Sequence, residues 1–150
     1  MSEQKTLLEQ LGGRPCLERV HKIFYDKLFA HPWLGQFFAG KNQKRQEDQQ
    51  SDFMTKPMGG EAIYSGKFPI PAHSNMYITD EMFDLRSGIL RESLREAGVP
   101  DHLAQKWLAI DNAFRTGIVK KNISDCVGRY KGEEILVYPD PSKAAGKKAA

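Results

Sequence analysis

The residues of this chain best suited to chemistry are one histidine in a proline-rich segment and two glutamines spaced four apart. His73 follows Pro69 and Pro71, which are expected to keep the backbone out of a helix and to hold the imidazole in an irregular segment. Gln46 and Gln50 share one face of any helix that contains them. A neutral imidazole can bind a metal, and amides can donate or accept hydrogen bonds. Taken alone, such a histidine more often packs or lies at the surface than binds a ligand.

The helix expected from about Asn42 to Lys56 is unusual because it has almost no apolar residue before Phe53. Gln46, Gln50 and Phe53 fall on one stripe of this helix. Two arrangements agree with the pattern: a solvated flap, or a helix with a polar inner face. Polar helices mostly lie at the surface, which by itself favours the flap. If the stripe faces inward, each amide needs a partner, because an unpaired buried polar group costs about 1–3 kcal/mol.

Length and charge indicate a single globular domain with an electrically balanced body. The chain has 150 residues, enough to bury a substantial core, and a net charge of +3. Residues 1–119 carry as many basic as acidic side chains, so the excess lies in residues 120–150. A balanced body argues against a nucleic-acid-binding surface, which needs a basic stripe. The Lys/Ala-rich end is expected to be a solvated terminus.

The two cysteines, Cys16 and Cys126, stand far apart in the sequence and belong to no CxxC or Cys/His cluster. Neither a zinc site nor a redox pair is therefore indicated. Cys16 lies in an apolar helical pattern and is expected to pack as a small hydrophobic side chain. The first residues do not resemble a signal peptide, and nowhere do 18 apolar residues follow one another. We expect a cytoplasmic protein with reduced thiols and no membrane contact.

The elements that must position these residues are predicted to be helices. A short apolar turn at 7–11 ends at two glycines, and the residue pattern then predicts four helices, at about 15–30, 42–56, 79–97 and 103–121. The stretch 61–75 is expected to be irregular. The run Glu133–Pro139 is expected to form a short extended segment that packs on the body, and the last ten residues are expected to be disordered. The predicted fold class is all-α.

Several motifs, in this order, resemble those of the truncated haemoglobins, and more closely the branch called group I. They are LGG at 11–13, FYDKLFAHPWLGQFFAG at 24–40, a Gln-rich helix containing Phe53, GG at 59–60, IYSGK at 63–67, AHSNMYIT at 72–79 and FD at 83–84. The resemblance covers about residues 5–120. It implies a two-over-two helical sandwich around one haem b per chain, with a very short first helix. It also implies a truncated globin domain at 1–123, followed by a C-terminal extension at 124–150 without an assigned function.

The resemblance implies roles for five residues of a haem pocket. His73 is similar in position to the proximal ligand of the haem iron, and Tyr25 to the distal tyrosine whose hydroxyl reaches an iron-bound ligand. Phe38 resembles the phenylalanine that packs against the haem face. Gln46 and Gln50 fall where the family has its distal helix residues, which would turn the polar stripe toward the ligand. Donors of this kind imply tight oxygen binding and slow release, which suits chemistry or sensing better than transport.

A further set of residues is expected to contact the haem or to pack in the core. Its apolar members, for each of which core packing is at least as good an interpretation, are Phe24, Phe53, Met54, Met76, Ile78, Phe83 and Trp107. The cations Lys41, Arg45 and Lys67 are candidates for the haem propionates, on charge and position. Arg86 departs from the resemblance, which implies an apolar residue there. Because a buried unpaired guanidinium is too costly, Arg86 must be exposed, paired with a propionate or carboxylate, or a sign of different local geometry.

Three functions agree with these observations. The first is a haem protein that binds oxygen, nitric oxide or carbon monoxide and uses oxygen to convert nitric oxide to nitrate. The sequence has no flavin or nicotinamide motif, so an external reductase would have to supply electrons. The second is a sensor or store of oxygen, sulfide or another small ligand, without turnover. The third is a helical interaction module without a cofactor, which leaves His73 and the polar helix unexplained. Nitrate formation distinguishes the first function from the second.

Overall fold

The computed structural model describes residues 5–143 as helices joined by turns and longer irregular segments. The α-helices are α1 Leu7–Leu11, α2 Arg14–Ala30, α3 Gln43–Thr55, α4 Pro69–His73, α5 Asp80–Glu96, α6 Asp101–Asn112 and α7 Arg115–Ile118, and the 3-10 helices are Leu34–Phe38 and Ile123–Asp125. Over these residues there is no strand, only an isolated parallel bridge between Met76 and Leu136. The all-α prediction is confirmed. Of the ten residues predicted to be disordered, 144–150 lie outside the described residues, and 141–143 form a helical turn instead.

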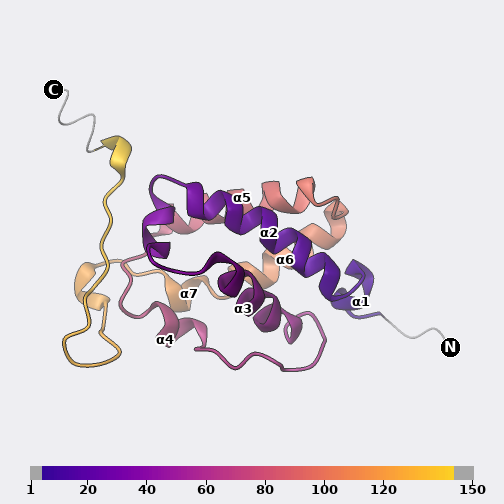
Figure 1. Ribbon diagram of the computed structural model, residues 1–150, viewed down its shortest axis with the longest axis horizontal. Coiled ribbons are helices and arrows are strands. Elements are labelled where there is room, and N and C mark those ends of the chain that lie inside the picture. The colour runs from indigo at the N-terminus through magenta and orange to yellow at the C-terminus, as the bar shows by residue number, and fades with distance from the viewer. Residues whose placement is uncertain (1–4, 144–150) are drawn as a thin grey trace.

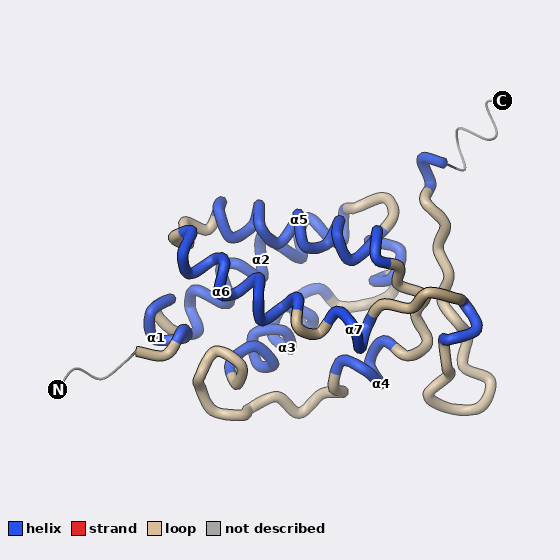
Figure 2. The backbone as a smooth tube through the Cα atoms, turned by 180° about the vertical axis from the view of Figure 1, so that it is seen from behind, coloured by secondary structure: helices blue, strands red, loops and turns tan. Residues whose placement is uncertain are grey.

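Two pairs of helices make up the body of the molecule (Figure 1). α2 packs against α3 and also against α5, and α5 packs against α6. Seen from behind, α4 and α7 lie side by side, and the segment after α7 runs at the end of the molecule opposite α1 (Figure 2). The largest fully buried side chains are Trp107, Phe24, Phe83, Leu17, Met54, Met58, Leu90 and Leu94. The apolar stripes of α2, α5 and α6 thus meet in one core, as their periodicity predicted.

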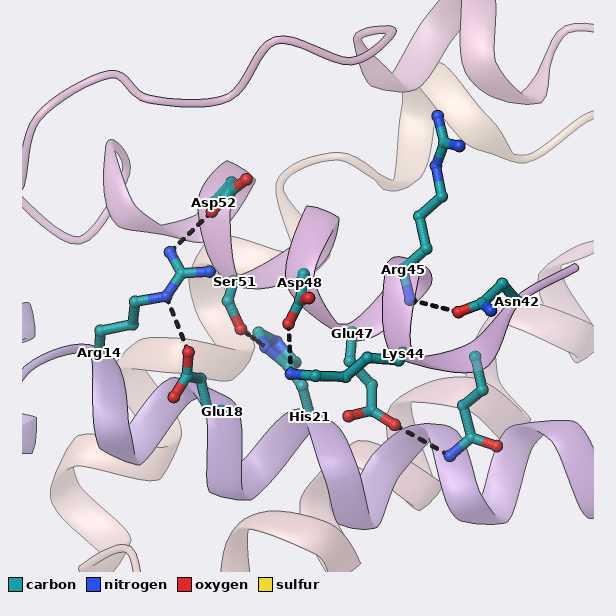
Figure 3. A network of polar contacts seen from close by, with 11 residues as sticks. Arg14, Glu18, His21, Asn42, Lys44, Arg45, Glu47, Asp48, Ser51 and Asp52 are labelled. Carbon is teal, nitrogen blue, oxygen red and sulfur yellow. Dashed lines mark hydrogen bonds and ion pairs between the residues drawn. The ribbon is translucent and has the colours of Figure 1, made fainter.

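The polar helix α3 is packed against α2 and is not a solvated flap. Its buried side chains are Glu47, Ser51, Met54 and Thr55. The Nδ1 atom of His21, on α2, lies 2.7 Å from the hydroxyl oxygen of Ser51, and both side chains are fully buried (Figure 3). At the edge of this contact, the guanidinium of Arg14 pairs with Asp52 at 2.7 Å. The flap interpretation is therefore wrong, because α3 packs on α2 and buries polar groups. The partner of Ser51 lies on α2, and those of Glu47 and Thr55 lie on α3 itself.

His21 makes the stability of the fold depend on pH. Burial lowers the pKa of its imidazole from 6.5 to about 3, because the charged form would lose its hydration. The folded protein keeps His21 neutral at pH 5, whereas the unfolded chain binds a proton there. The stabilising contribution is therefore present above pH 6.5 and is lost as the pH falls. Between pH 7 and pH 5, the free energy of unfolding should fall by about 2 kcal/mol more in the wild type than in His21→Asn.

Asparagine at this position can still bond to Ser51 but does not titrate. Denaturant unfolding of both proteins at the two pH values measures the difference. The matched control is His102→Asn, because His102 is exposed near the start of α6. Between pH 7 and pH 5, the free energy of unfolding of that variant should fall by as much as that of the wild type. Equal pH dependence in the wild type and His21→Asn would contradict a buried, neutral His21.

The predicted secondary structure is wrong in two places. α4, at Pro69–His73, is a short helix within the stretch predicted to be irregular, and it includes two prolines. Both prolines lie in its first turn, where the backbone N–H groups have no intrahelical acceptor. The last predicted helix ends early, because α6 stops at Asn112 and a separate turn, α7, begins at Arg115. Beside this break, the ring of Phe114 lies 5.1 Å from the ring of Phe53.

The segment after α7 is fastened to the stretch of chain that follows α4. The backbone N–H of Leu136 donates to the oxygen of Asn75 at 2.8 Å, and the N–H of Tyr77 donates to the oxygen of Leu136 at 2.9 Å. The indole N–H of Trp33 donates to the backbone oxygen of Tyr138 at 2.6 Å. The prediction that this run is extended and packs on the body is confirmed.

Candidate functional site

A cavity of about 920 Å³ lies among α2, α3, α4, α5 and the segment after α7. Much of its lining is apolar or aromatic, and it includes Leu28, Leu34, Phe37, Phe38, Phe53, Met54, Met76, Ile78, Met82, Phe83, Phe114, Ile118 and Leu136. Polar and charged side chains make up nearly half of the lining residues. A large cavity that combines apolar walls with convergent polar groups is typical of a cofactor site.

His73 is the last residue of α4 and lines this cavity. Its Nδ1 atom lies 2.7 Å from the backbone oxygen of Pro69, so Nδ1 carries the proton and Nε2 keeps its lone pair. Burial lowers the pKa of the imidazole, which favours the neutral form. The Nζ atom of Lys120 donates to the backbone oxygen of His73 at 2.6 Å and holds the end of α4. A neutral imidazole with a fixed tautomer is what a metal ligand requires.

Tyr25 brings a hydroxyl group to the same cavity from α2. Burial raises the pKa of its phenol to about 12, so the hydroxyl stays protonated at neutral pH and can donate. Among residues 5–143 the hydroxyl has no hydrogen-bond partner, and it is not sealed in the protein interior. The ring of Phe38 meets the Tyr25 ring edge-on at 5.9 Å between centroids. The donor is thus held in place and directed at the cavity.

α3 adds amide groups to the cavity. The side chain of Asn42 caps this helix by accepting a hydrogen bond from the N–H of Arg45 at 2.9 Å. Gln46 and Gln50 line the cavity, as does Gln49. In the part of the chain that the structure describes, the amides of Gln46 and Gln50 face this space without a protein partner. α3 therefore has two polar faces, one packed on α2 and one turned to the cavity.

Basic side chains line the exposed end of the cavity. The lining includes the three candidates for pairing with the haem propionates, Lys41, Arg45 and Lys67. Figure 3 shows Arg45 extending from α3 away from α2. Arg129, from the segment after α7, joins them and is also paired with Glu133. This end of the cavity suits the acidic part of a ligand.

Five of the seven apolar residues predicted to contact a cofactor or pack in the core line the cavity: Phe53, Met54, Met76, Ile78 and Phe83. The other two, Trp107 and Phe24, are buried in the core and are not part of the lining. The guanidinium of Arg86 lies 5.1 Å from the centre of the Phe24 ring. Phe24 is one position away from Tyr25 on α2, so the helix turns its ring toward α5.

Arg86 is paired with a carboxylate, which is one of the three outcomes expected for it. Its Nη1 atom donates to the Oδ2 atom of Asp111 at 2.6 Å and so joins α5 to α6. Both residues line the cavity. A sign of this pair is visible in the sequence, because Asp111 lies four residues after Trp107 and therefore on the buried stripe of its helix.

Other lining residues were not predicted. Phe114 and Ile118 belong to a predicted apolar stripe, which indicated burial but not a place in this cavity. Asn75, Arg129 and Leu136 come together only because the segment after α7 folds back, and no local pattern indicates that. None of the helices in residues 5–143 combines the length and the apolar character that crossing a membrane requires.

Comparisons with known proteins agree with this geometry. The family model described as "Bacterial-like globin" matches residues 6–119. The chain is 31% identical over 129 residues to a group 1 truncated hemoglobin of Tetrahymena thermophila, a match that covers 86% of this chain and all of that protein. The crystal structure of truncated hemoglobin from Tetrahymena pyriformis, Fe(III) form, matches with a TM-score of 0.72 at 30% identity, over 78% of this chain and all of that one.

A further structural match shows the same arrangement of helices in a bacterial protein. The 2/2 hemoglobin from Synechococcus, solved with covalently attached heme, gives a TM-score of 0.70 at 27% identity, over 77% of this chain and 98% of that one. The resemblance found in the sequence motifs is confirmed by the family model and by these relatives. The chain belongs to the bacterial-like globin family, that of the truncated haemoglobins, which implies a haem cofactor and the binding of diatomic ligands.

Proposed function

We propose that this truncated haemoglobin binds one haem b through His73 and uses oxygen to convert nitric oxide to nitrate in the cytoplasm. The observation that carries the proposal is the meeting of two kinds of group in one cavity. An imidazole with an available Nε2 comes from α4, and the donors Tyr25, Gln46 and Gln50 come from α2 and α3. The imidazole suits iron, and the donors suit a ligand that gains negative charge.

The cavity fits haem in size and chemistry. Its volume is about 920 Å³, its walls combine apolar and polar side chains, and Phe38 and Phe83 offer aromatic rings. Lys41, Arg45 and Lys67, at the exposed end, can pair with the two propionate groups. Haem supplies a redox-active iron with four nitrogen donors of its own, so one protein imidazole completes its attachment. His73 is the residue that would provide it.

The chain contributes to this chemistry by holding and stabilising the diatomic ligand. Oxygen takes on partial negative charge in such a site, and hydrogen bonds to charged acceptors contribute about 1.5–3 kcal/mol each. Tyr25 remains a donor over the whole neutral range because burial raises the pKa of its phenol to about 12. Tyr25 is buried, and a hydrogen bond removed from bulk water is stronger than the same bond in water. Oxygen held in this way stays available for reaction with nitric oxide.

Nitrate formation tests the reaction. Nitric oxide, oxygen and one electron together give nitrate, and the electron must come from an external reductase. We expect the oxygenated ferrous protein to yield stoichiometric nitrate when mixed with nitric oxide, measured by stopped-flow absorption and ion chromatography. Repeated turnover should follow once a flavin reductase and NADH are added. The carbon monoxide form of the same protein is the control and should yield none.

The contrary outcome would separate haem binding from turnover. A protein that binds nitric oxide and releases it unchanged, with no nitrate, would be a sensor or store of oxygen, sulfide or another small ligand. The proposed haem site would stand in that case, and the proposed reaction would not. A protein without an intense Soret band after addition of hemin would contradict both.

A further inference from the structure

The pair formed by Arg86 and Asp111 places a guanidinium and its counter-charge in the lining of the cavity. The Nη1 atom of Arg86 donates to Asp111 at 2.6 Å. The guanidinium lies 5.1 Å from the ring centre of Phe24 and 5.6 Å from that of Phe83, so two aromatic faces and one carboxylate fix its position. Phe24 also meets the ring of Tyr25 at 5.2 Å. Arg86 and Tyr25 therefore both contact this buried ring, and both line the cavity.

The hydrogen-bond donors of Arg86 exceed the acceptors that the protein offers it. A guanidinium has five N–H groups. Within the described residues, the only acceptor for them is the carboxylate of Asp111. The remaining N–H groups are not sealed in the interior, because the side chain is 26% exposed and lines the cavity. These donors therefore face the space that a ligand would occupy.

The charge of the lining also favours an anion. Asp111 is the one carboxylate among the described lining residues, and its side chain is 7% exposed. Beyond Arg86, the lining has four further cations, Lys41, Arg45, Lys67 and Arg129, all at the exposed end. The haem propionates would meet the cations at the exposed end. Arg86 is only 26% exposed, and it contacts the ring of Phe24, which also meets Tyr25, so a small ligand and not a propionate would be bound there.

We infer that Arg86, held by Asp111, forms a binding site for a small monovalent inorganic anion inside the cavity, next to Tyr25. Such an anion accepts from the unused N–H groups of Arg86, and Asp111 weakens its binding by partly neutralising the guanidinium. The inference rests on the proposed haem function, because an anion in this space would be a ligand of the haem iron as well as of Arg86. The class includes fluoride, azide, nitrite and hydrosulfide.

Titration of the ferric holoprotein with sodium fluoride and sodium azide, followed by absorption, tests the site. Arg86→Met should weaken the affinity for both anions about 10- to 100-fold, as expected for loss of a charged hydrogen bond. Asp111→Asn should strengthen it, because the guanidinium then loses its counter-charge. A purely structural role for the pair predicts changes in the same direction for both variants. These opposite signs are the signature of an anion site.

Arg115→Met is the matched control for the arginine. The guanidinium of Arg115 lies 4.8 Å from the ring centre of Phe83, closer than that of Arg86 at 5.6 Å. It pairs with Asp80 and Asp84, however, and is not part of the cavity lining. Its replacement should leave both anion affinities unchanged. A fall equal to that of the Arg86 variant would point to a general effect of surface charge and would overturn the inference.

Two further comparisons keep the test decisive. Arg86→Met leaves Asp111 buried and unpaired, which can prevent folding, so the double variant Arg86→Met with Asp111→Asn is measured against Asp111→Asn alone. The double variant should bind fluoride about 10- to 100-fold more weakly than that single variant. Equal fluoride affinities, in proteins with a normal Soret band and normal carbon monoxide binding, would overturn the anion site. Absence of the Soret band in the wild type would instead contradict the proposed function.

Discussion

Replacing His73 with glycine is expected to abolish stable haem binding. His73 offers the cavity a neutral imidazole whose Nδ1 is bonded to the oxygen of Pro69 at 2.7 Å and whose Nε2 is available. Loss of even an outer-shell partner of a metal ligand costs about 10- to 100-fold in metal affinity, so loss of the ligand itself should cost at least about a hundredfold. The change should appear as a lost or strongly altered Soret band in the purified protein, as isolated, reduced, and reduced under carbon monoxide.

Added imidazole distinguishes a lost ligand from a damaged fold. Glycine leaves a space of the size of the missing side chain, so imidazole in solution should restore a shifted Soret band to the variant. His102→Gly is the matched control, because His102 is exposed near the start of α6, and its Soret band should match that of the wild type. A normal spectrum in His73→Gly would show that another residue binds the iron and that His73 is not its ligand.

The parts of this fold that could be predicted are those whose information is local. α2 and α5 repeat their apolar residues with the helical period, and their burial in one core follows directly from that pattern. The Thr79 cap of α5 accepts from the N–H of Met82 at 3.2 Å, as the residue types at the start of that helix indicated. The prolines of α4 were misleading because proline breaks a helix only beyond its first turn.

The burial of α3 could not be predicted because it depends on packing against α2, including one polar partner for Ser51 on that helix. His21 and Ser51 bond to each other across α2 and α3, and neither residue alone indicates a buried position. The cavity was predicted only as far as the family motifs extend. Arg129 and Leu136 lie beyond residue 119, where the family match ends, yet both line the cavity. Their place depends on hydrogen bonds between segments about sixty residues apart, such as that from Leu136 to Asn75.

The Arg86–Asp111 pair shows what family resemblance alone leaves out. The motifs implied an apolar residue at position 86, and the opposite charges of the pair stand on α5 and α6, which are packed together. Without its partner on the other helix, each charge would be costly to remove from water. Together they form an ion pair whose carboxylate is buried, and loss of the arginine would leave that carboxylate unpaired. The departure from the motif pattern is therefore a feature of the cavity and not an error in the assignment.

Replacing Tyr25 with phenylalanine is expected to speed oxygen release from the ferrous holoprotein at least about tenfold. The variant removes one hydroxyl donor, whose bond to a charged acceptor is worth about 1.5–3 kcal/mol, and about 1.4 kcal/mol corresponds to each tenfold. It keeps the ring, so the edge-on contacts with Phe24 at 5.2 Å and Phe38 at 5.9 Å remain. The measurement is the rate at which excess carbon monoxide replaces oxygen in a stopped-flow experiment.

The matched control for this change is Tyr77→Phe. The hydroxyl of Tyr77 donates to the backbone oxygen of Lys121 at 3.3 Å, and Tyr77 is not among the described residues that line the cavity. Its loss should leave the rate of oxygen release as in the wild type. An unchanged rate in Tyr25→Phe would exclude the tyrosine as a main donor and would leave Gln46 and Gln50 to hold the ligand. In that case Gln50→Leu, and not Tyr25→Phe, should produce the large increase, because α3 would then supply the donors.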